Sequence, residues 1–174
     1  MIEHRTKKWY AVYTRSRAEK KAAAELDESG IEVFLPLYKT IRQWSDRRKK
    51  VQIPLIRSYL FVNISRREYF KVLKAQGVVE YVKFLGKPPS IPAWQIQNLK
   101  ILLGSGEPFE IVTDQFNEGD LVEISAGVLK GLRGKIVKIR RKKKLLISLD
   151  ALEYSYTVDI HPALVEPVKK IKQG

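Results

Sequence analysis

The side chains that most often perform catalysis or bind metals are scarce in this sequence. None of its 174 residues is Cys, and its two His residues, His4 and His161, lie far apart. The absence of Cys excludes disulfides, zinc knuckles and thiolate nucleophiles. Asp114, Glu118 and Asp120 are close in sequence, but no partnered base or metal-ligand set accompanies them. We therefore expect no enzymatic activity, no bound metal and no cofactor.

The chemistry that the sequence does offer is attraction to polyanions. Its 33 Lys and Arg residues exceed its 19 Asp and Glu residues, which gives a formal net charge of +14. Residues 1–103 hold 21 basic and 9 acidic residues, residues 104–118 hold 4 acidic and no basic residues, and residues 119–174 hold 12 basic and 6 acidic residues. A balance of this kind indicates contact with nucleic acid or with a nucleic-acid machine.

One short run concentrates this charge more than any other. Arg140, Arg141, Lys142, Lys143 and Lys144 follow one another at a predicted hairpin turn. A solvated turn without a ligand explains such a run, and so does a contact with RNA or with phosphate groups. Both interpretations remain open from the sequence.

The elements that must position these residues are well marked at the start of the chain. Lys8–Thr14 alternates aromatic and small residues, which predicts a strand. Ser16 and Glu19 have the spacing of a capping box, and the Ala-rich helix that follows is expected to end near Ser29. Gly30 is placed to close that helix in the left-handed conformation.

The next segment predicts a hairpin arm. Ile31–Ile41 is apolar and extended, although Pro36 interrupts it, and Val51–Ile53 resumes the apolar pattern. The stretch between them is polar and basic, and its basic residues are Arg42, Arg47, Arg48, Lys49 and Lys50.

Three further elements complete the N-terminal half. Arg57–Ile64 is the strongest strand of the chain, and Ser65 and Glu68 form a second capping box before a short helix. Val78–Leu85 predicts another strand, and Pro92–Leu103 predicts a helix with one apolar face. The order indicates an α+β fold, in which helices pack against a mostly antiparallel sheet.

Both faces of this sheet carry apolar side chains, since alternate residues of a strand point to opposite sides. Helices on both faces would explain the pattern. Alternatively, Tyr13, Tyr59 and Phe61 form an exposed aromatic patch that docks a partner. The residues alone do not choose between these interpretations.

The acidic segment 104–118 separates two domains in this interpretation, residues 1–103 and residues 119–174. It holds Gly104, Ser105, Gly106 and Pro108, which suits an exposed flexible linker. The second domain is expected to be a small SH3-like barrel of five short strands. These strands are Leu121–Ser125, Arg133–Ile139, Leu145–Leu149, Tyr154–Ile160 and Leu164–Val168.

Glycines punctuate the first connection of this barrel, at Gly127, Gly131 and Gly134. The segment superficially suggests a phosphate-binding loop. Ile136 stands where such a loop needs Ser or Thr, so we exclude nucleotide binding.

Taken together, these segments resemble the NusG family of transcription elongation factors, in which an NGN domain precedes a KOW domain. Lys8–Tyr13 and the helix after it look like the opening of the NGN domain, and Pro54–Val62 looks like its PLFPGY-type signature strand. Gly119–Ile124 and Gly127–Ile136 are similar to the KOW motif. The matches cover nearly the whole chain in the family's order.

The resemblance implies how the N-terminal domain works. NGN domains bind the clamp helices of RNA polymerase and stabilise the closed, processive enzyme. Carried over by position, the polymerase-binding residues are Tyr13, Tyr59 and Phe61. Arg15 and Lys21 match positions that face the displaced non-template DNA strand in specialised relatives, where positive charge favours phosphates without reading sequence.

The resemblance also implies partners for the second domain. KOW domains of the family recruit a ribosomal protein, the termination factor Rho, or RNA. The residues of this chain that match the KOW motif are Gly119, Asp120, Gly127, Gly131 and Gly134.

Departures from the housekeeping pattern favour a specialised paralogue. Ile56-Arg57-Ser58 replaces Phe-Pro-Gly, and the segment after Val62 is short, as in antiterminators of surface-polysaccharide operons. We expect a cytoplasmic, monomeric antitermination factor without a signal peptide or membrane span. The alternatives are a housekeeping NusG-type factor that couples transcription to Rho or the ribosome, and a ribosome- or RNA-binding KOW protein.

Overall fold

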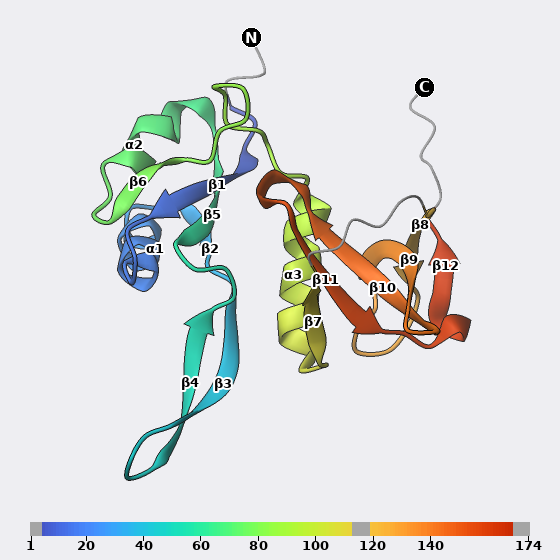
Figure 1. Ribbon diagram of the computed structural model, residues 1–174. Coiled ribbons are helices and arrows are strands. Elements are labelled where there is room, and N and C mark those ends of the chain that lie inside the picture. The colour runs from blue at the N-terminus through green and yellow to red at the C-terminus, as the bar shows by residue number, and fades with distance from the viewer. Residues whose placement is uncertain (1–4, 113–118, 169–174) are drawn as a thin grey trace, which may run out of the picture. The chain divides into compact units, whose positions relative to one another are not determined.

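The computed structural model describes residues 5–112 and 119–168 (Figure 1). The chain forms two compact units, residues 1–92 and residues 93–174. Each is described by itself below. The class is α+β with antiparallel sheets, as the sequence predicts. No helix in the described ranges is long and apolar enough to cross a bilayer.

A four-stranded antiparallel sheet forms the first unit. Its order is β2-β5-β1-β6, with β2 at Glu32–Phe34, β5 at Tyr59–Ile64, β1 at Lys8–Thr14 and β6 at Val78–Tyr81. The predicted strand Val78–Leu85 therefore ends four residues early.

Two helices pack on one face of this sheet, α1 (Glu19–Glu28) and α2 (Tyr69–Leu73), with a 3-10 turn η1 (Arg66–Glu68) leading into α2. Alternate residues of the central strands share a core with them. The buried members of this core are Val12, Ala22, Leu26, Ile31, Leu60, Val62, Ile64, Val72, Ala75 and Tyr81.

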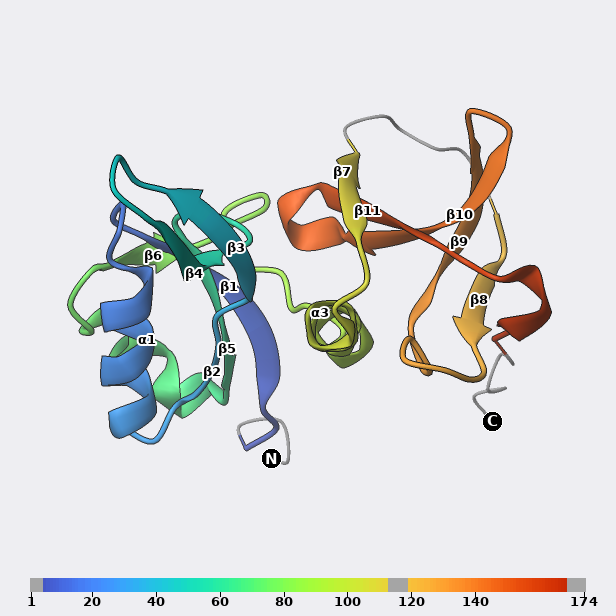
Figure 2. The same ribbon diagram turned by 90° about the horizontal axis from the view of Figure 1, so that it is seen from below.

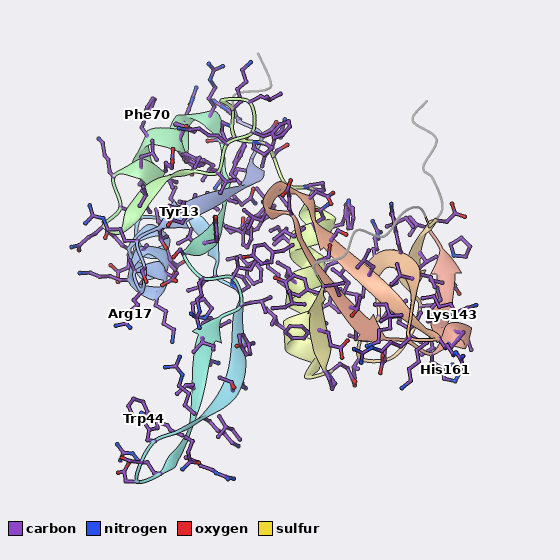
Figure 3. All side chains as sticks on the ribbon, in the orientation of Figure 1. Tyr13, Arg17, Trp44, Phe70, Lys143 and His161 are labelled. Atoms are coloured by element: carbon purple, nitrogen blue, oxygen red, sulfur yellow. The ribbon has the colours of Figure 1, made fainter. Side chains whose placement is uncertain are left out.

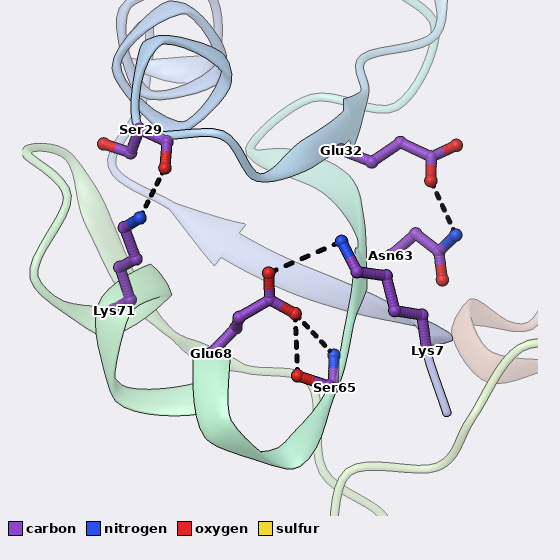
Figure 4. Close-up of polar contacts among 7 residues, drawn as sticks. All are labelled: Lys7, Ser29, Glu32, Asn63, Ser65, Glu68 and Lys71. Carbon is purple, nitrogen blue, oxygen red and sulfur yellow. Dashed lines mark hydrogen bonds and ion pairs between the residues drawn. The ribbon is translucent and has the colours of Figure 1, made fainter. Parts of the chain in front are cut away.

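The second predicted capping box is confirmed (Figure 4). The backbone N–H and the hydroxyl of Ser65 both donate to Glu68 Oε2, each at 2.8 Å, and Lys7 Nζ lies 3.4 Å from Glu68 Oε1. Burial raises the pKa of Glu68, but the hydrogen bonds from Ser65 and the charge of Lys7 outweigh it, so the pKa lies below its ordinary value.

The first predicted capping box is wrong. The residue before α1 is Ala18, and no side chain caps the helix. Glu19 instead accepts a hydrogen bond from the backbone N–H of Ser58, at 2.7 Å. A tertiary partner has replaced the local one. The predicted helix end is confirmed, since Gly30 has φ +79° and donates to the carbonyl of Asp27 at 2.8 Å.

The predicted hairpin arm is present. β3 (Leu37–Gln43) and β4 (Arg48–Pro54) form a two-stranded antiparallel sheet of their own. The extended segment Ile31–Ile41 is divided at Pro36, because β2 joins the four-stranded sheet while β3 joins the arm. Figure 1 shows the arm projecting from the sheet of its unit.

The second unit holds all five predicted strands and one more. β8 (Leu121–Ile124), β9 (Arg133–Ile139), β10 (Lys142–Leu149), β11 (Tyr154–Asp159) and β12 (Val165–Pro167) form one antiparallel sheet, with short 3-10 turns after β10 and before β12. Figure 2 shows these strands curling into an open barrel. Its buried apolar residues are Val122, Ile124, Leu129, Leu132, Val137, Leu145, Leu146, Ile147, Leu149, Tyr156 and Val158.

The sixth strand corrects the predicted linker 104–118. β7 (Phe109–Val112) pairs with β11 and completes the order β12-β8-β9-β10-β11-β7. The Phe109 ring contacts the Tyr156 ring edge-on, with centroids 5.8 Å apart. Residues 109–112 are therefore part of the sheet and not of a flexible linker, because they pair with the edge that β11 offers. Residues 113–118 lie outside the described ranges.

The division between the units also differs from the expected one at residue 103. Helix α3 (Ala93–Ser105) groups with the barrel. Asn98 Nδ2 donates to the carbonyl of Arg133 at 2.7 Å, and Asn98 Oδ1 accepts from its N–H at 2.9 Å. Gln95 Nε2 donates to Asp150 Oδ2 at 2.7 Å. These buried amides fix the helix to β9 and to the turn after β10.

Candidate docking face and basic surfaces

The aromatic side chains predicted to bind a partner lie on the face of the four-stranded sheet away from α1 and α2. Tyr13 on β1 pairs across the strands with Tyr59 on β5, and Ala11 pairs with Phe61. Both helices of residues 5–92 place their buried residues on the opposite face, where Val12 and Leu60 lie. The alternative with helices of this unit on both faces is not observed in that range.

Exposure differs among the three predicted residues. Tyr13 is 40% exposed and Tyr59 is half-buried, and their rings meet edge-on with centroids 5.4 Å apart. Phe61 is 0% exposed and stacks on Phe34 at 6.1 Å. The prediction that all three rings are exposed is therefore wrong for Phe61. The register explains this, because β2 flanks β5 only from Phe61 to Asn63 and leaves Tyr59 beyond its edge.

A basic cleft of about 590 Å³ opens beside the start of α1, at the base of the arm. The charged residues that line it are Arg17, Glu19, Lys20, Arg42 and Arg57. The cleft is thus lined by four cations and one anion, and the carboxylate of that anion, Glu19, already accepts a hydrogen bond from Ser58. Such a cleft attracts phosphate groups.

The two residues predicted to lie near nucleic acid in this region are neighbours of the cleft. Arg15 and Lys21 are exposed, but neither lines it, whereas Arg17 and Lys20 do. Arg17 turns the chain between β1 and α1 with φ +64° (Figure 3). The sequence locates the basic region, and the turn decides which side chains enter the cleft.

The basic run of the barrel lies at a hairpin turn, as predicted. Arg140 and Arg141, with φ +48° and +67°, form the two-residue connection between β9 and β10. Lys142 and Lys143 are exposed on β10. Lys144 is only 13% exposed, and its Nζ lies 2.8 Å from Glu110 Oε2 and 3.5 Å from Asp159 Oδ1.

Lys144 is thus engaged in ion pairs with two exposed carboxylates of the barrel surface. The hydrogen bond from Lys144 to Glu110, together with the charges of Glu110 and Asp159, raises the pKa of Lys144. Of the five residues in the run, the other four project their charge to solvent.

The residues that match the KOW motif have structural roles in the barrel. Gly127 and Gly131 have φ +83° and +86°. A Cβ on Gly134 would lie 2.2 Å from the carbonyl oxygen of Leu146, and one on Gly119 would lie 3.3 Å from that of Ile136. Glycine at 134 therefore lets β9 and β10 approach each other. Asp120 is exposed before β8.

No metal centre is apparent among residues 5–112 and 119–168. No three His, Asp or Glu side chains in these ranges gather closely enough to hold an ion.

Comparison with known proteins decides the family. A family model described as transcription termination factor nusG matches residues 7–100, which is 94 of the 174 residues. The chain belongs to the NusG family. Members of this family are transcription termination and antitermination factors.

Several relatives within the NusG family match along most of this chain. The transcription termination/antitermination protein NusG of Rickettsia bellii (strain RML369-C) is 20% identical over 155 residues, which cover 83% of this chain and 80% of the relative. The protein of the same name from Streptococcus pyogenes serotype M3 is 22% identical over 174 residues, covering 92% and 97%. A solved structure described as domain interaction in Thermotoga maritima NusG covers 94% of this chain and 98% of its own, at 24% identity and a TM-score of 0.45.

Within this NusG-family chain, Trp44 is a functional candidate that the sequence interpretation missed. Its indole is 53% exposed at the end of the arm. The sequence does contain a signal for this candidate, because Trp44 is the sole aromatic residue from 39 to 58 and lies within the basic stretch.

Proposed function

We propose that this chain is a transcription elongation and antitermination factor that binds RNA polymerase through its N-terminal unit. Binding there suppresses pausing or termination and increases processivity on specific long operons. Membership of the NusG family supports this function. The observation that carries the polymerase contact is the aromatic face of the sheet opposite α1 and α2.

Tyr13 and Tyr59 are the residues we expect to anchor the polymerase. They lie side by side on adjacent strands and offer two rings with hydroxyl groups at their edges. Aromatic anchors of this kind supply much of the binding energy at protein interfaces. The clamp helices are the partner that the family resemblance implies, and Phe61, two residues after Tyr59, is buried against Phe34 on the same face.

Nucleic acid is the second partner in this proposal. The cleft lined by Arg17, Lys20, Arg42 and Arg57 provides phosphate contacts beside the docking face of the same unit. Arg15 and Lys21 add positive charge next to it. A protein bound to an elongating polymerase meets displaced DNA and nascent RNA, so these cations stabilise the complex without selecting a sequence.

Operon specificity is the finer part of the proposal. Ile56-Arg57-Ser58 replaces the housekeeping sequence, and here Ile56 is buried, Arg57 lines the cleft and Ser58 has φ +64°. Of these three residues, only Arg57 is among those that line the cleft, to which it adds a cation. The ribosomal protein, Rho or RNA that the barrel recruits stays a prediction from the resemblance.

In vitro transcription tests the proposal. Purified protein is added to the cognate polymerase on a terminator template that carries the chain's own leader, and read-through is measured. We expect increased read-through with wild-type protein and none with Tyr13→Ala or Tyr59→Ala, since losing a central aromatic anchor costs about 2 kcal/mol or more.

Phe70→Ala is the matched control, because Phe70 is 71% exposed on α2, away from the docking face. It should leave read-through unchanged. Unchanged pausing and termination with wild-type protein on every template would overturn the proposal. Co-purification with ribosomes and not with polymerase would favour a ribosome- or RNA-binding role instead.

A further inference from the structure

We propose that the arm formed by β3 and β4 binds single-stranded nucleic acid, with a base stacked on Trp44 and phosphates held by the basic side chains beside it. The inference concerns the free protein and does not depend on polymerase binding. It rests on the shape, the charge and the exposed aromatic residue of the arm.

The arm has a defined shape. Its strands pair continuously from Leu37 opposite Pro54 to Gln43 opposite Arg48, and the N–H of Trp44 donates to the carbonyl of Arg47 at 2.8 Å to close the turn. At the base, Lys20 Nζ donates to the carbonyl of Gln52 at 2.7 Å, which ties the arm to α1. The arm is therefore a regular hairpin with Trp44 at its closing turn.

The charge of the arm is strong and largely unbalanced. Residues 37–54 hold six basic residues and one acidic residue, Asp46, for a net charge of +5. Arg42 and Lys49 lie directly opposite each other, an arrangement that costs stability in an isolated sheet. Arg47, 3.9 Å from Asp46, is the one arm cation with an ion pair in the described residues. A surface with this excess of exposed cations attracts polyanions, and the phosphates of a nucleic acid are such a ligand.

Trp44 narrows the expected ligand from polyanions in general to those that also offer a flat ring for stacking. Its indole is 53% exposed, and Ile41 on the preceding strand is 61% exposed. Figure 3 shows Trp44 projecting at the end of the arm. Duplex DNA needs only the cations, since its bases are stacked on one another. Unpaired bases have free faces, and stacking on an aromatic side chain together with cations along the backbone is how proteins hold single strands.

Fluorescence anisotropy with labelled 20-nucleotide oligo(dT), oligo(U) and a 20-base-pair duplex tests the proposal on the full chain. We expect at least one of the single strands to bind more tightly than the duplex. Trp44→Ala should weaken single-strand binding on the order of tenfold, whereas Trp44→Phe keeps most of it. The two single strands distinguish DNA from RNA as the source of the ligand.

The basic residues have their own test. Lys49→Gln with Lys50→Gln should reduce the dependence of the logarithm of affinity on the logarithm of salt concentration by about 1.4, because each lost contact to a single strand contributes about 0.7. Phe70→Ala, which removes an exposed aromatic side chain outside the arm, should bind as wild type does.

Two results would overturn the proposal. One is single-strand affinity of Trp44→Ala equal to that of the wild-type chain. The other is tighter binding to the duplex than to both single strands. Neither result bears on polymerase docking, because Tyr13 and Tyr59 are unchanged in these variants.

Discussion

The arm β3–β4 and the barrel hairpin β9–β10 are both basic antiparallel hairpins with short turns, yet they use their charge differently. Residues 133–149 hold eight basic and no acidic residues, more than the +5 of the arm. The barrel hairpin is flanked by β8 and β11, and two of its cations are engaged. Arg133 Nε lies 2.6 Å from Glu123 Oε2, and Lys144 contacts Glu110 and Asp159. No aromatic residue occurs in residues 133–149.

The two hairpins show that a high density of basic residues does not by itself identify a binding surface. In the barrel hairpin, part of the charge stabilises the sheet, and the inward side chains belong to a core. In the arm, both strands are exposed over their outer halves, the like charges face each other, and an indole stands at the end. The barrel hairpin therefore serves mainly to build the sheet of its unit, whereas most side chains in the outer half of the arm are exposed.

The sharpest test of this contrast is Gly134→Ala in the barrel hairpin. The added Cβ would lie 2.2 Å from the carbonyl oxygen of Leu146, so β9 and β10 must separate. We expect the free energy of unfolding to fall by about 3 kcal/mol, measured by chemical denaturation. Gly104→Ala on α3, where no atom lies within 4 Å, is the control and should not lower stability. An unchanged unfolding midpoint for Gly134→Ala would contradict the structural role.

A second test compares how the two hairpins are anchored. Asn98→Ala leaves the N–H and the carbonyl of Arg133 without their partner, and we expect a loss of about 2 kcal/mol. Lys20→Ala removes the tie between α1 and the arm, which is exposed, and should cost less than about 0.5 kcal/mol. Gln97→Ala, exposed on the same helix as Asn98, is the control. Equal losses for Asn98→Ala and Lys20→Ala would break the comparison.

A third test separates charge from stacking. Lys142→Gln with Lys143→Gln removes two exposed cations from a hairpin that has no aromatic side chain. We expect several-fold weaker binding to duplex and to single strands alike, with no selective loss for single strands, because only phosphate contacts are lost. Anisotropy titrations at two salt concentrations measure this. A selective loss for single strands would show that the barrel hairpin also reads unpaired bases.

The smallest expected effect distinguishes Lys144 from Lys143. Lys144 has a raised pKa because of Glu110 and Asp159, so its contribution to stability is complete below the unfolded pKa of about 10.4 and is lost as the pH rises through the folded pKa. At pH 7, Lys144→Gln should lower the thermal unfolding midpoint slightly at low salt and less at high salt. Lys143→Gln should leave the midpoint unchanged at both salt concentrations.

Two capping motifs with the same spacing show how far local sequence reaches. Ser65 and Glu68 form the expected capping box. Glu19 forms none with Ser16 and instead accepts a hydrogen bond from the N–H of Ser58. The motif is the same, but only the second lies where no distant backbone group competes. Sequence cannot reveal that competition, because Ser58 is 39 residues away from Glu19.

For the candidate sites too, the sequence located the region, and the folded structure decided which side chains are accessible. Alternation placed Tyr13, Tyr59 and Phe61 on one face, and in the folded sheet Tyr13 is exposed, Tyr59 is half-buried and Phe61 is buried. The basic region at α1 was also predicted, but the left-handed turn at Arg17 decides which cations enter the cleft.

By itself, the sequence determined most of the strands, the arm, and the turn at Arg140 and Arg141. These follow from periodicity, glycines and charge, which act over a few residues. The resemblance to the NusG family rests on matched motifs along the sequence. Only the tertiary structure decided that Phe109–Val112 is a strand, that α3 is fixed to β9, and that Lys144 is engaged while the cations of the arm are mostly not. Each of these depends on a partner far away in the chain, and such partners become neighbours only after folding.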